Sequence, residues 1–489
     1  MISKRECIFG AAAVALASQA GPALAQTSAA GPFVTRHRGQ FGAATIDYVA
    51  TVTETILNDA AGAPALSLVS TAYTRADADP RTRPVVFIFN GGPSVASSIL
   101  HMFALGPKRI LVEQNPALPP TEPARLIDNT YSALDVADLV FVDPAETGFS
   151  RVLPSGNRAD YYNVIGDARS ISDFVIAWSR ANGRENAPKY VLGESYGTLR
   201  ATMMAGQLAE TMPLDGVFLF GQAVNMIETS QRAKNAIAYA TNLPALVAIA
   251  AYHRRINTRG RSMSQLIDAA YDWGMNEYLL ALTRGRDLPI RQQRRIAGDL
   301  EAMTGIGAAY YLEHELAITK VDFATEFLRA EGRILGTYDA RYTAPVGSPE
   351  PSTRVLAPAT PMAAQHLTQT LGAQRPAADY RSGAPDTIAN WNWSRTGGIG
   401  GPFDDYNYQA QISRAFAANP RFRLMIGTGI YDLTTTVGPA RYLVAKSDYP
   451  AERVTLRQYE GGHAAYTNEP ALRAFSDDVR AWVTGGLPR

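Results

Sequence analysis

The chain has 489 residues, and 46 Lys and Arg against 45 Asp and Glu leave a formal charge of +1. Without an excess of positive charge, the composition does not indicate a nucleic-acid partner. With 46% hydrophobic and 19% charged residues, the chain can bury a large core and is not mostly disordered. The length allows about three domains of about 150 residues each, or one large domain with an insertion.

The first 25 residues have the pattern of a secretory signal peptide. Two basic residues precede an apolar run at residues 8–17, and A-L-A at residues 23–25 supplies a cleavage site. We therefore expect an exported, periplasmic or extracellular protein; a structural N-terminal helix is the alternative. The apolar run is shorter than the ~20 residues of a membrane span, so we expect no integral membrane segment after cleavage. The single cysteine, Cys7, would leave with the signal peptide, which excludes disulfides and Cys-based zinc sites.

Short apolar runs mark the strands of the mature chain. They occupy residues 46–52, 66–73, 85–89, 139–142 and 190–192. The last three are unbroken, as in strands of a parallel sheet buried on both faces. Residues 168–180 carry apolar side chains at helical spacing between two of these runs. The sequence therefore predicts an α/β fold with a mostly parallel central sheet flanked by helices.

The pattern changes after residue 224. Helical periodicity then dominates, so we expect residues 225–387 to form a helical lid or insertion, with a proline-rich extended loop at 338–381. We interpret the Arg- and Gln-rich stretch at 291–295 as a solvated helix face. Strand runs resume near 424–426 and 454–456, and a last helix is predicted at 471–483. The predicted units are thus core residues 33–224, the insertion at 225–387, and core residues 388–489.

Residues 193–197 read G-E-S-Y-G between a predicted strand and a predicted helix. A sharp strand-to-helix turn needs glycines beside the serine, and it lifts the serine hydroxyl into the open. The motif alone is a weak signal, but this context is the one that a nucleophile requires. Ser195 is therefore the candidate nucleophile.

A nucleophilic serine needs a base and an acid that orients the base. His463 follows a predicted strand in a Gly-flanked loop, and Asp432 follows the apolar run near residue 425, which gives the chain order Ser, Asp, His. The alternatives are a loop histidine and a turn aspartate. The remaining histidines are interpreted differently: His101 as a packed side chain, and the others as surface residues, namely His37, His253, His314 and His366.

The run N-G-G-P at residues 90–93 ends another buried strand. An oxyanion hole needs two backbone N–H donors, and Gly92 and Tyr196 are placed to supply them. A simple Asn-Gly turn is the alternative for residues 90–93. No phosphate-binding glycine motif occurs after these strands, and we identify no cofactor and no metal ligands.

These motifs together resemble the serine carboxypeptidase family, which has the α/β-hydrolase fold. The matching pieces, in chain order, are residues 89–93, 105–107, 142–150, 193–197, 429–433 and 461–463. The resemblance implies catalytic roles for Ser195, Asp432 and His463, with oxyanion donors at Gly92 and Tyr196. It also implies that the substrate's C-terminal carboxylate is bound by Asn90, Gly91 and Glu194.

Some positions depart from the family pattern. Ala104 stands where eukaryotic members carry a second glutamate, Glu146 stands where a small residue is usual, and the family disulfides are absent. These features resemble a bacterial branch. A glutamate that binds a carboxylate must be protonated or share a proton. Because Glu194 lacks a carboxylate partner at Ala104, we expect its pKa not to be strongly raised and the pH profile to follow His463 near neutrality.

The leading hypothesis is an exported serine-type carboxypeptidase that releases C-terminal residues from peptides through an acyl-enzyme. An esterase or acyltransferase is the nearest alternative, because fold and triad do not set the acyl donor. A non-catalytic binding protein that kept the scaffold is a second alternative. The expected partner is a peptide substrate and not a nucleic acid, and the oligomeric state is left open.

Overall fold

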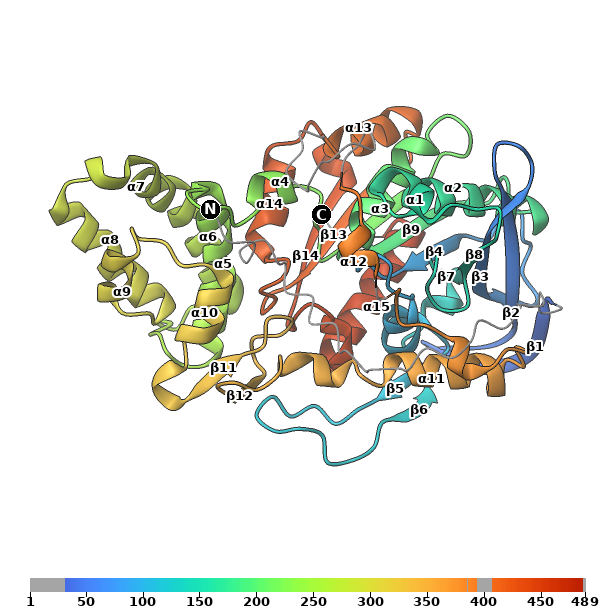
Figure 1. Ribbon diagram of the computed structural model, residues 1–489, viewed down its shortest axis with the longest axis horizontal. Coiled ribbons are helices and arrows are strands. Elements are labelled where there is room, and N and C mark those ends of the chain that lie inside the picture. The colour runs from blue at the N-terminus through green and yellow to red at the C-terminus, as the bar shows by residue number, and fades with distance from the viewer. Residues whose placement is uncertain (1–30, 385, 394–406, 487–489) are drawn as a thin grey trace.

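The computed structural model describes residues 31–384, 386–393 and 407–486. The expected signal peptide and Cys7 lie outside the described residues. A ten-stranded sheet crosses the molecule in the order β1-β2-β3-β7-β4-β9-β10-β13-β14, with β8 paired to β3 (Figure 1). Its strands are β1 (Phe33–Phe41), β2 (Ala44–Asn58), β3 (Pro64–Arg75), β4 (Val85–Phe89), β7 (Asp138–Val142), β8 (Arg151–Val152), β9 (Lys189–Glu194), β10 (Gly216–Phe220), β13 (Arg423–Gly429) and β14 (Val454–Tyr459).

The sheet is antiparallel at one side and parallel over the rest. β1, β2 and β3 form an antiparallel meander that joins β7, and every neighbouring pair from β7 to β14 is parallel. The carboxyl ends of the parallel strands therefore meet at one edge, where ligands of such sheets bind. Together with the flanking helices, this strand order confirms the predicted α/β-hydrolase fold.

Alternate strand residues face two separate apolar layers. Val85, Phe87 and Phe89 pack toward α2 (Val164–Ala181) and α3 (Gly197–Gln207). Val86 and Ile88 belong to the opposite layer, which holds Trp482 of α15 (Glu469–Thr484). α13 (Gln409–Ala418) and α14 (Val437–Ala445) complete the first layer, and η1 (Leu100–Leu105) and α11 (Ala359–Gln365) complete the second. Burial on both faces explains the unbroken apolar runs.

The first helices after β10, from α4 to α10, extend the molecule beyond β14 (Figure 1). They are α4 (Met226–Thr229), α5 (Ala236–Tyr252), α6 (Met263–Trp273), η3 (Gly274–Tyr278), α7 (Leu279–Arg284), η4 (Gly285–Asp287), α8 (Ile290–Thr304), α9 (Ala308–Glu313) and α10 (Lys320–Glu326). A third apolar cluster fills this region, and Ile430, Tyr431 and Leu433 from the loop after β13 pack into it. Within the described ranges, no helix is both long and apolar enough to cross a bilayer.

Residues 338–381 are not simply an extended loop. They contain α11 and the π-helical turn η7 (His366–Thr370). Pro358 is the N-cap of α11 and Pro361 lies in its first turn, where a missing backbone N–H removes no helical hydrogen bond. The loop expectation was therefore wrong for this part. The remaining short elements are β5 (Lys108–Leu111), β6 (Arg125–Asp128), η2 (Ala133–Asp135), α1 (Arg158–Tyr161), η5 (Arg329–Glu331), β11 (Arg333–Leu335), β12 (Thr343–Pro345), η6 (Ser352–Val355), η8 (Ala377–Asp379), α12 (Thr387–Asn390), η9 (Ala451–Arg453) and η10 (Ala465–Thr467).

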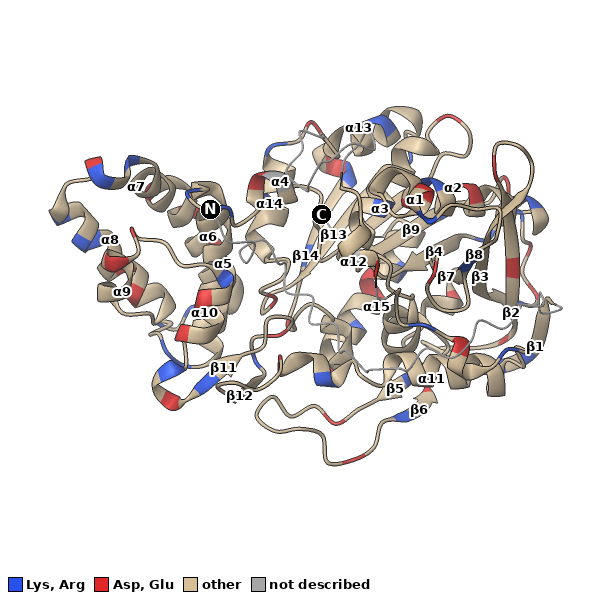
Figure 2. Cartoon of the chain, in the orientation of Figure 1, with Lys and Arg blue, Asp and Glu red and all other residues tan. Residues whose placement is uncertain are grey.

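Charged side chains of both signs are spread over the face seen in Figure 2. The basic stretch at 291–295 lies at the start of α8, and its four residues other than Gln293 are exposed. Arg295 pairs with Glu277 and with Asp299. The interpretation of this stretch as a solvated helix face is thus confirmed.

Candidate active site

Ser195 lies in the tight turn between β9 and α3. Its φ of 58° is in the left-handed region that non-glycine residues rarely adopt, and its N–H donates to the Phe220 carbonyl at 2.9 Å. A Cβ at Gly193 would collide with the Gly197 carbonyl oxygen, and one at Gly197 would lie 3.0 Å from the Asn90 carbonyl oxygen, which is a tight contact. The G-x-S-x-G sequence therefore forms the strained elbow that it predicts, and Ser195 is partly exposed at its tip.

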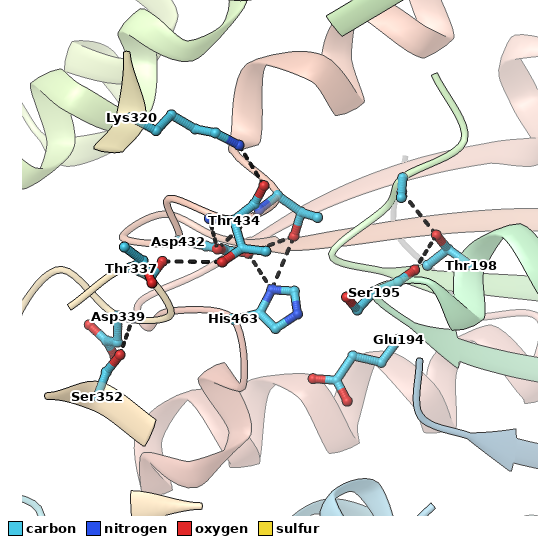
Figure 3. Close-up of polar contacts among 12 residues, drawn as sticks. Glu194, Ser195, Thr198, Lys320, Thr337, Asp339, Ser352, Asp432, Thr434 and His463 are labelled. Carbon is cyan, nitrogen blue, oxygen red and sulfur yellow. Dashed lines mark hydrogen bonds and ion pairs between the residues drawn. The ribbon is translucent and has the colours of Figure 1, made fainter. Parts of the chain in front are cut away.

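Asp432 and His463 follow the next strands of the parallel sheet, β13 and β14. The Nδ1 of His463 lies 2.7 Å from Oδ2 of Asp432, and the side chains are 5% and 0% exposed. Because Nδ1 faces a carboxylate, the neutral ring carries its proton there. The other ring nitrogen points toward Ser195 (Figure 3). In the described structure these two side chains face each other without a hydrogen bond, and such contacts commonly tighten only when substrate binds.

The carboxylate of Asp432 is fixed by the two residues that follow Leu433. Its Oδ1 accepts the N–H groups of Thr434 at 2.6 Å and Thr435 at 3.1 Å, and the Thr435 hydroxyl donates to Oδ2 at 2.6 Å. Burial lowers the pKa of His463, but the charge and hydrogen bond of Asp432 outweigh it, so the pKa is raised overall. The threonines were not predicted, because nothing in T-T-T marks a carboxylate clamp.

The turn after β4 lies against the elbow. A Cβ at Gly91 would lie 2.6 Å from the Tyr196 nitrogen, so only glycine permits this approach, and Gly92 has a φ of 112°. Among the described residues, neither the Gly92 N–H nor the Tyr196 N–H donates a hydrogen bond within the protein. Two unengaged donors thus lie beside Ser195.

Glu194 is buried next to the nucleophile, 3% exposed. The amide of Asn90 donates to its Oε2, and the Tyr466 hydroxyl lies 2.8 Å and 2.7 Å from its two oxygens. Burial raises the pKa of Glu194 to about 7, and the charge of His463 and the hydrogen bonds only partly oppose this rise. The expectation that the pKa of Glu194 is not strongly raised was wrong. Burial disfavours the ionised carboxylate, as a second carboxylate nearby would.

Comparisons with known proteins agree with this geometry over part of the chain. Residues 72–216 match the serine carboxypeptidase family. The match includes residues 90–93 and 193–197 but stops before Asp432 and His463. A curated relative, "Serine carboxypeptidase-like 16" of Arabidopsis thaliana, is 29% identical over 126 residues, which is 25% of this chain and 28% of the relative. The predicted resemblance to serine carboxypeptidases is thus confirmed, and it supports a serine hydrolase.

Solved structures give a weaker likeness. The peroxisomal α/β-hydrolase Lpx1 of Saccharomyces cerevisiae has 10% identity and a TM-score of 0.36, covering 91% of both chains. An epoxide hydrolase mutant from Aspergillus niger has 13% identity and a TM-score of 0.37, covering 90% of this chain and 79% of that chain.

Two residues of the segment between β10 and β13 reach the candidate active site. The Tyr338 carbonyl accepts the His463 N–H, and its ring stands perpendicular to the imidazole at 5.0 Å. The Lys320 Nζ donates to the Thr434 carbonyl at 2.6 Å (Figure 3). Both residues lie more than 90 positions from the residues they contact, so no local motif could have indicated them.

Other residues singled out from the sequence have structural roles. His101 is packed, as expected, and stacks on Phe141 at 4.2 Å. His366 was expected on the surface but is 3% exposed, because its Nε2 and that of His101 both bond the Tyr73 hydroxyl, at 3.0 Å and 2.8 Å. Glu146 is buried and accepts from Arg158 at 3.3 Å and Arg381 at 2.6 Å.

Proposed function

We propose that the protein is an exported serine carboxypeptidase that releases C-terminal residues from peptides. The observation that carries the proposal is the His463–Asp432 contact of 2.7 Å, which turns the second ring nitrogen toward the strained Ser195. The relatives add support for acyl chemistry at this serine.

In the proposed reaction, His463 removes the hydroxyl proton as Ser195 attacks the last peptide carbonyl. The N–H groups of Gly92 and Tyr196 receive the charge on the carbonyl oxygen. His463 then gives its proton to the leaving amino acid. Water repeats the sequence on the acyl-enzyme, with His463 again taking and returning the proton.

Recognition of a free carboxylate is assigned to Asn90, Gly91 and Glu194. With a pKa of about 7, Glu194 is largely protonated in mildly acidic medium and can donate to the substrate carboxylate. Its partner Tyr466 holds the acid in place. Export and a periplasmic or extracellular location are part of the proposal and rest on the sequence of residues 1–25.

The test uses one peptide with either a free or an amidated C-terminus and follows the products by mass spectrometry. We expect stepwise trimming of the free form only. Equal trimming of both would refute carboxypeptidase specificity. Turnover of short esters without trimming of any peptide would favour the esterase or acyltransferase alternative. A fluorophosphonate that fails to label Ser195, with Ser195→Ala as the blank, would favour a binding protein.

A further inference from the structure

Arg200 is a charged side chain with no exposure to solvent, in α3 and five residues after the nucleophile. Its Nε donates to Oδ2 of Asp167 at 2.8 Å, and these two side chains are 0% and 3% exposed. A fully buried ion pair is poor evidence for stability, because apolar side chains of similar size often serve as well. The pair therefore calls for a reason other than stability.

Each partner of this ion pair also contacts one side of the oxyanion region. Arg200 Nη1 donates to the Asn90 carbonyl at 2.8 Å, at the start of the turn that carries the Gly92 N–H. Asp167 accepts the Tyr196 hydroxyl at 3.1 Å. The guanidinium also lies 4.9 Å from the centre of the Phe89 ring. The ion pair, which joins α2 and α3, thus contacts the backbone of one oxyanion segment at Asn90 and the side chain of the other at Tyr196.

We propose that Arg200 and Asp167 are a positioning pair that sets the spacing of the two oxyanion donors. Oxyanion donors act through their fixed placement, and loss of one costs about 10²–10³ in kcat. A donor that is displaced and not removed should cost less, about 10–100-fold. The inference rests on the proposed function, since it presupposes acyl transfer at Ser195.

The main test variant is the double substitution Arg200→Met with Asp167→Leu, which leaves no buried charge unpaired. We expect it to fold and to lose about 10–100-fold in kcat on an ester substrate, with KM unchanged. Affinity for a trifluoromethyl ketone, whose serine adduct carries an oxyanion, should fall by the same factor. Affinity for the product acid should not change. Arg200→Lys keeps the charge but cannot reach two acceptors with a planar fork, and should show a smaller loss of the same kind.

Arg83→Lys is the matched control. Arg83 also joins a buried carboxylate and a backbone carbonyl, Asp138 at 2.8 Å and Leu134 at 2.6 Å, but at the opposite ends of the strands. It should lower thermal stability and leave kcat and ketone affinity unchanged. Wild-type kcat and ketone affinity in either Arg200 variant would overturn the positioning role while leaving the proposed function intact. A wild-type protein that neither turns over esters nor reacts with a fluorophosphonate would instead overturn both.

Discussion

At the scale of single residues, Glu194 stands out because its protonation changes near neutral pH. Burial raises its pKa to about 7, whereas an exposed glutamate ionises near 4.3. Below pH 7 the neutral carboxyl can share its proton with a substrate carboxylate. Above pH 7 two close negative charges would repel each other.

The expected result is a KM for free-carboxylate peptides that rises above about pH 7, by up to tenfold per pH unit. Glu194→Gln should remove this rise, since the amide donates a hydrogen bond at every pH. An ester without a carboxylate serves as control and should show no such dependence in either protein. Steady-state KM measured from pH 5 to 9 checks this, and a flat wild-type profile would contradict it.

The sequence could indicate the residues of local motifs and little beyond them. Ser195, Gly92 and Asn90 lie in sharp turns that require glycine at neighbouring positions. Short glycine motifs in the sequence are therefore enough to indicate these residues. Tyr466 and Thr435 belong to no recognisable sequence motif. Tyr466 contacts Glu194 only in the folded protein, and the Thr435 hydroxyl contacts Asp432 in a turn whose sequence does not indicate it. Burial of Glu194 is likewise a property of the assembled layers, which explains why its pKa could not be predicted.

At the scale of elements, α10 links the helical insertion to the loop at residues 430–436, which follows β13 and carries Asp432; we call it the acid loop. Lys320 begins this helix and donates to the Thr434 carbonyl. Burial lowers the pKa of Lys320 to about 8, so it carries a charge near neutrality, and this charge opposes protonation of His463.

Lys320→Met should therefore raise the pKa of His463 further. The acid limb of kcat/KM on an ester should move to higher pH, by roughly half a pH unit for one charge at this range. Lys320→Arg keeps the charge and should leave the limb in place. A limb that stays fixed or moves to lower pH in Lys320→Met would contradict the coupling.

Elements were predictable where burial is uniform or periodic. The runs at 85–89, 139–142 and 424–426 became β4, β7 and β13, and the helix near 168–180 became α2. β10 was missed, although V-F-L-F at 217–220 has the same apolar pattern. β1 was missed because its side chains alternate between half-buried and exposed, and its partner β2 supplies the stability of this edge strand.

At the scale of the whole molecule, the third apolar cluster forms a core apart from the two sheet layers. Leu300 of α8 is 1% exposed within it, and the acid loop contributes Ile430 and Leu433. Regions with their own core can open without the rest. We infer that the helices from α5 to α10 unfold as a separate unit.

Leu300→Ala should cost that unit about 2–5 kcal/mol. Hydrogen exchange followed by mass spectrometry should then speed up in α5 to α9 and in the acid loop, but not in β9. Leu472→Ala, a matched change in the α15 layer, should leave α5 to α9 unchanged. Equal acceleration of all segments in Leu300→Ala would show a single cooperative unit.

The connection between β10 and β13 also sets an order of events. These neighbours pair although about 200 residues separate them, and closing so long a loop costs only about 0.6 kcal/mol more for each doubling of length. Ser195 is synthesised before this connection, and Asp432 and His463 come after it. A nascent chain therefore contains the turn with Ser195 before it contains the base, His463. The proposed acyl transfer becomes possible only when β13 and β14 have joined the sheet.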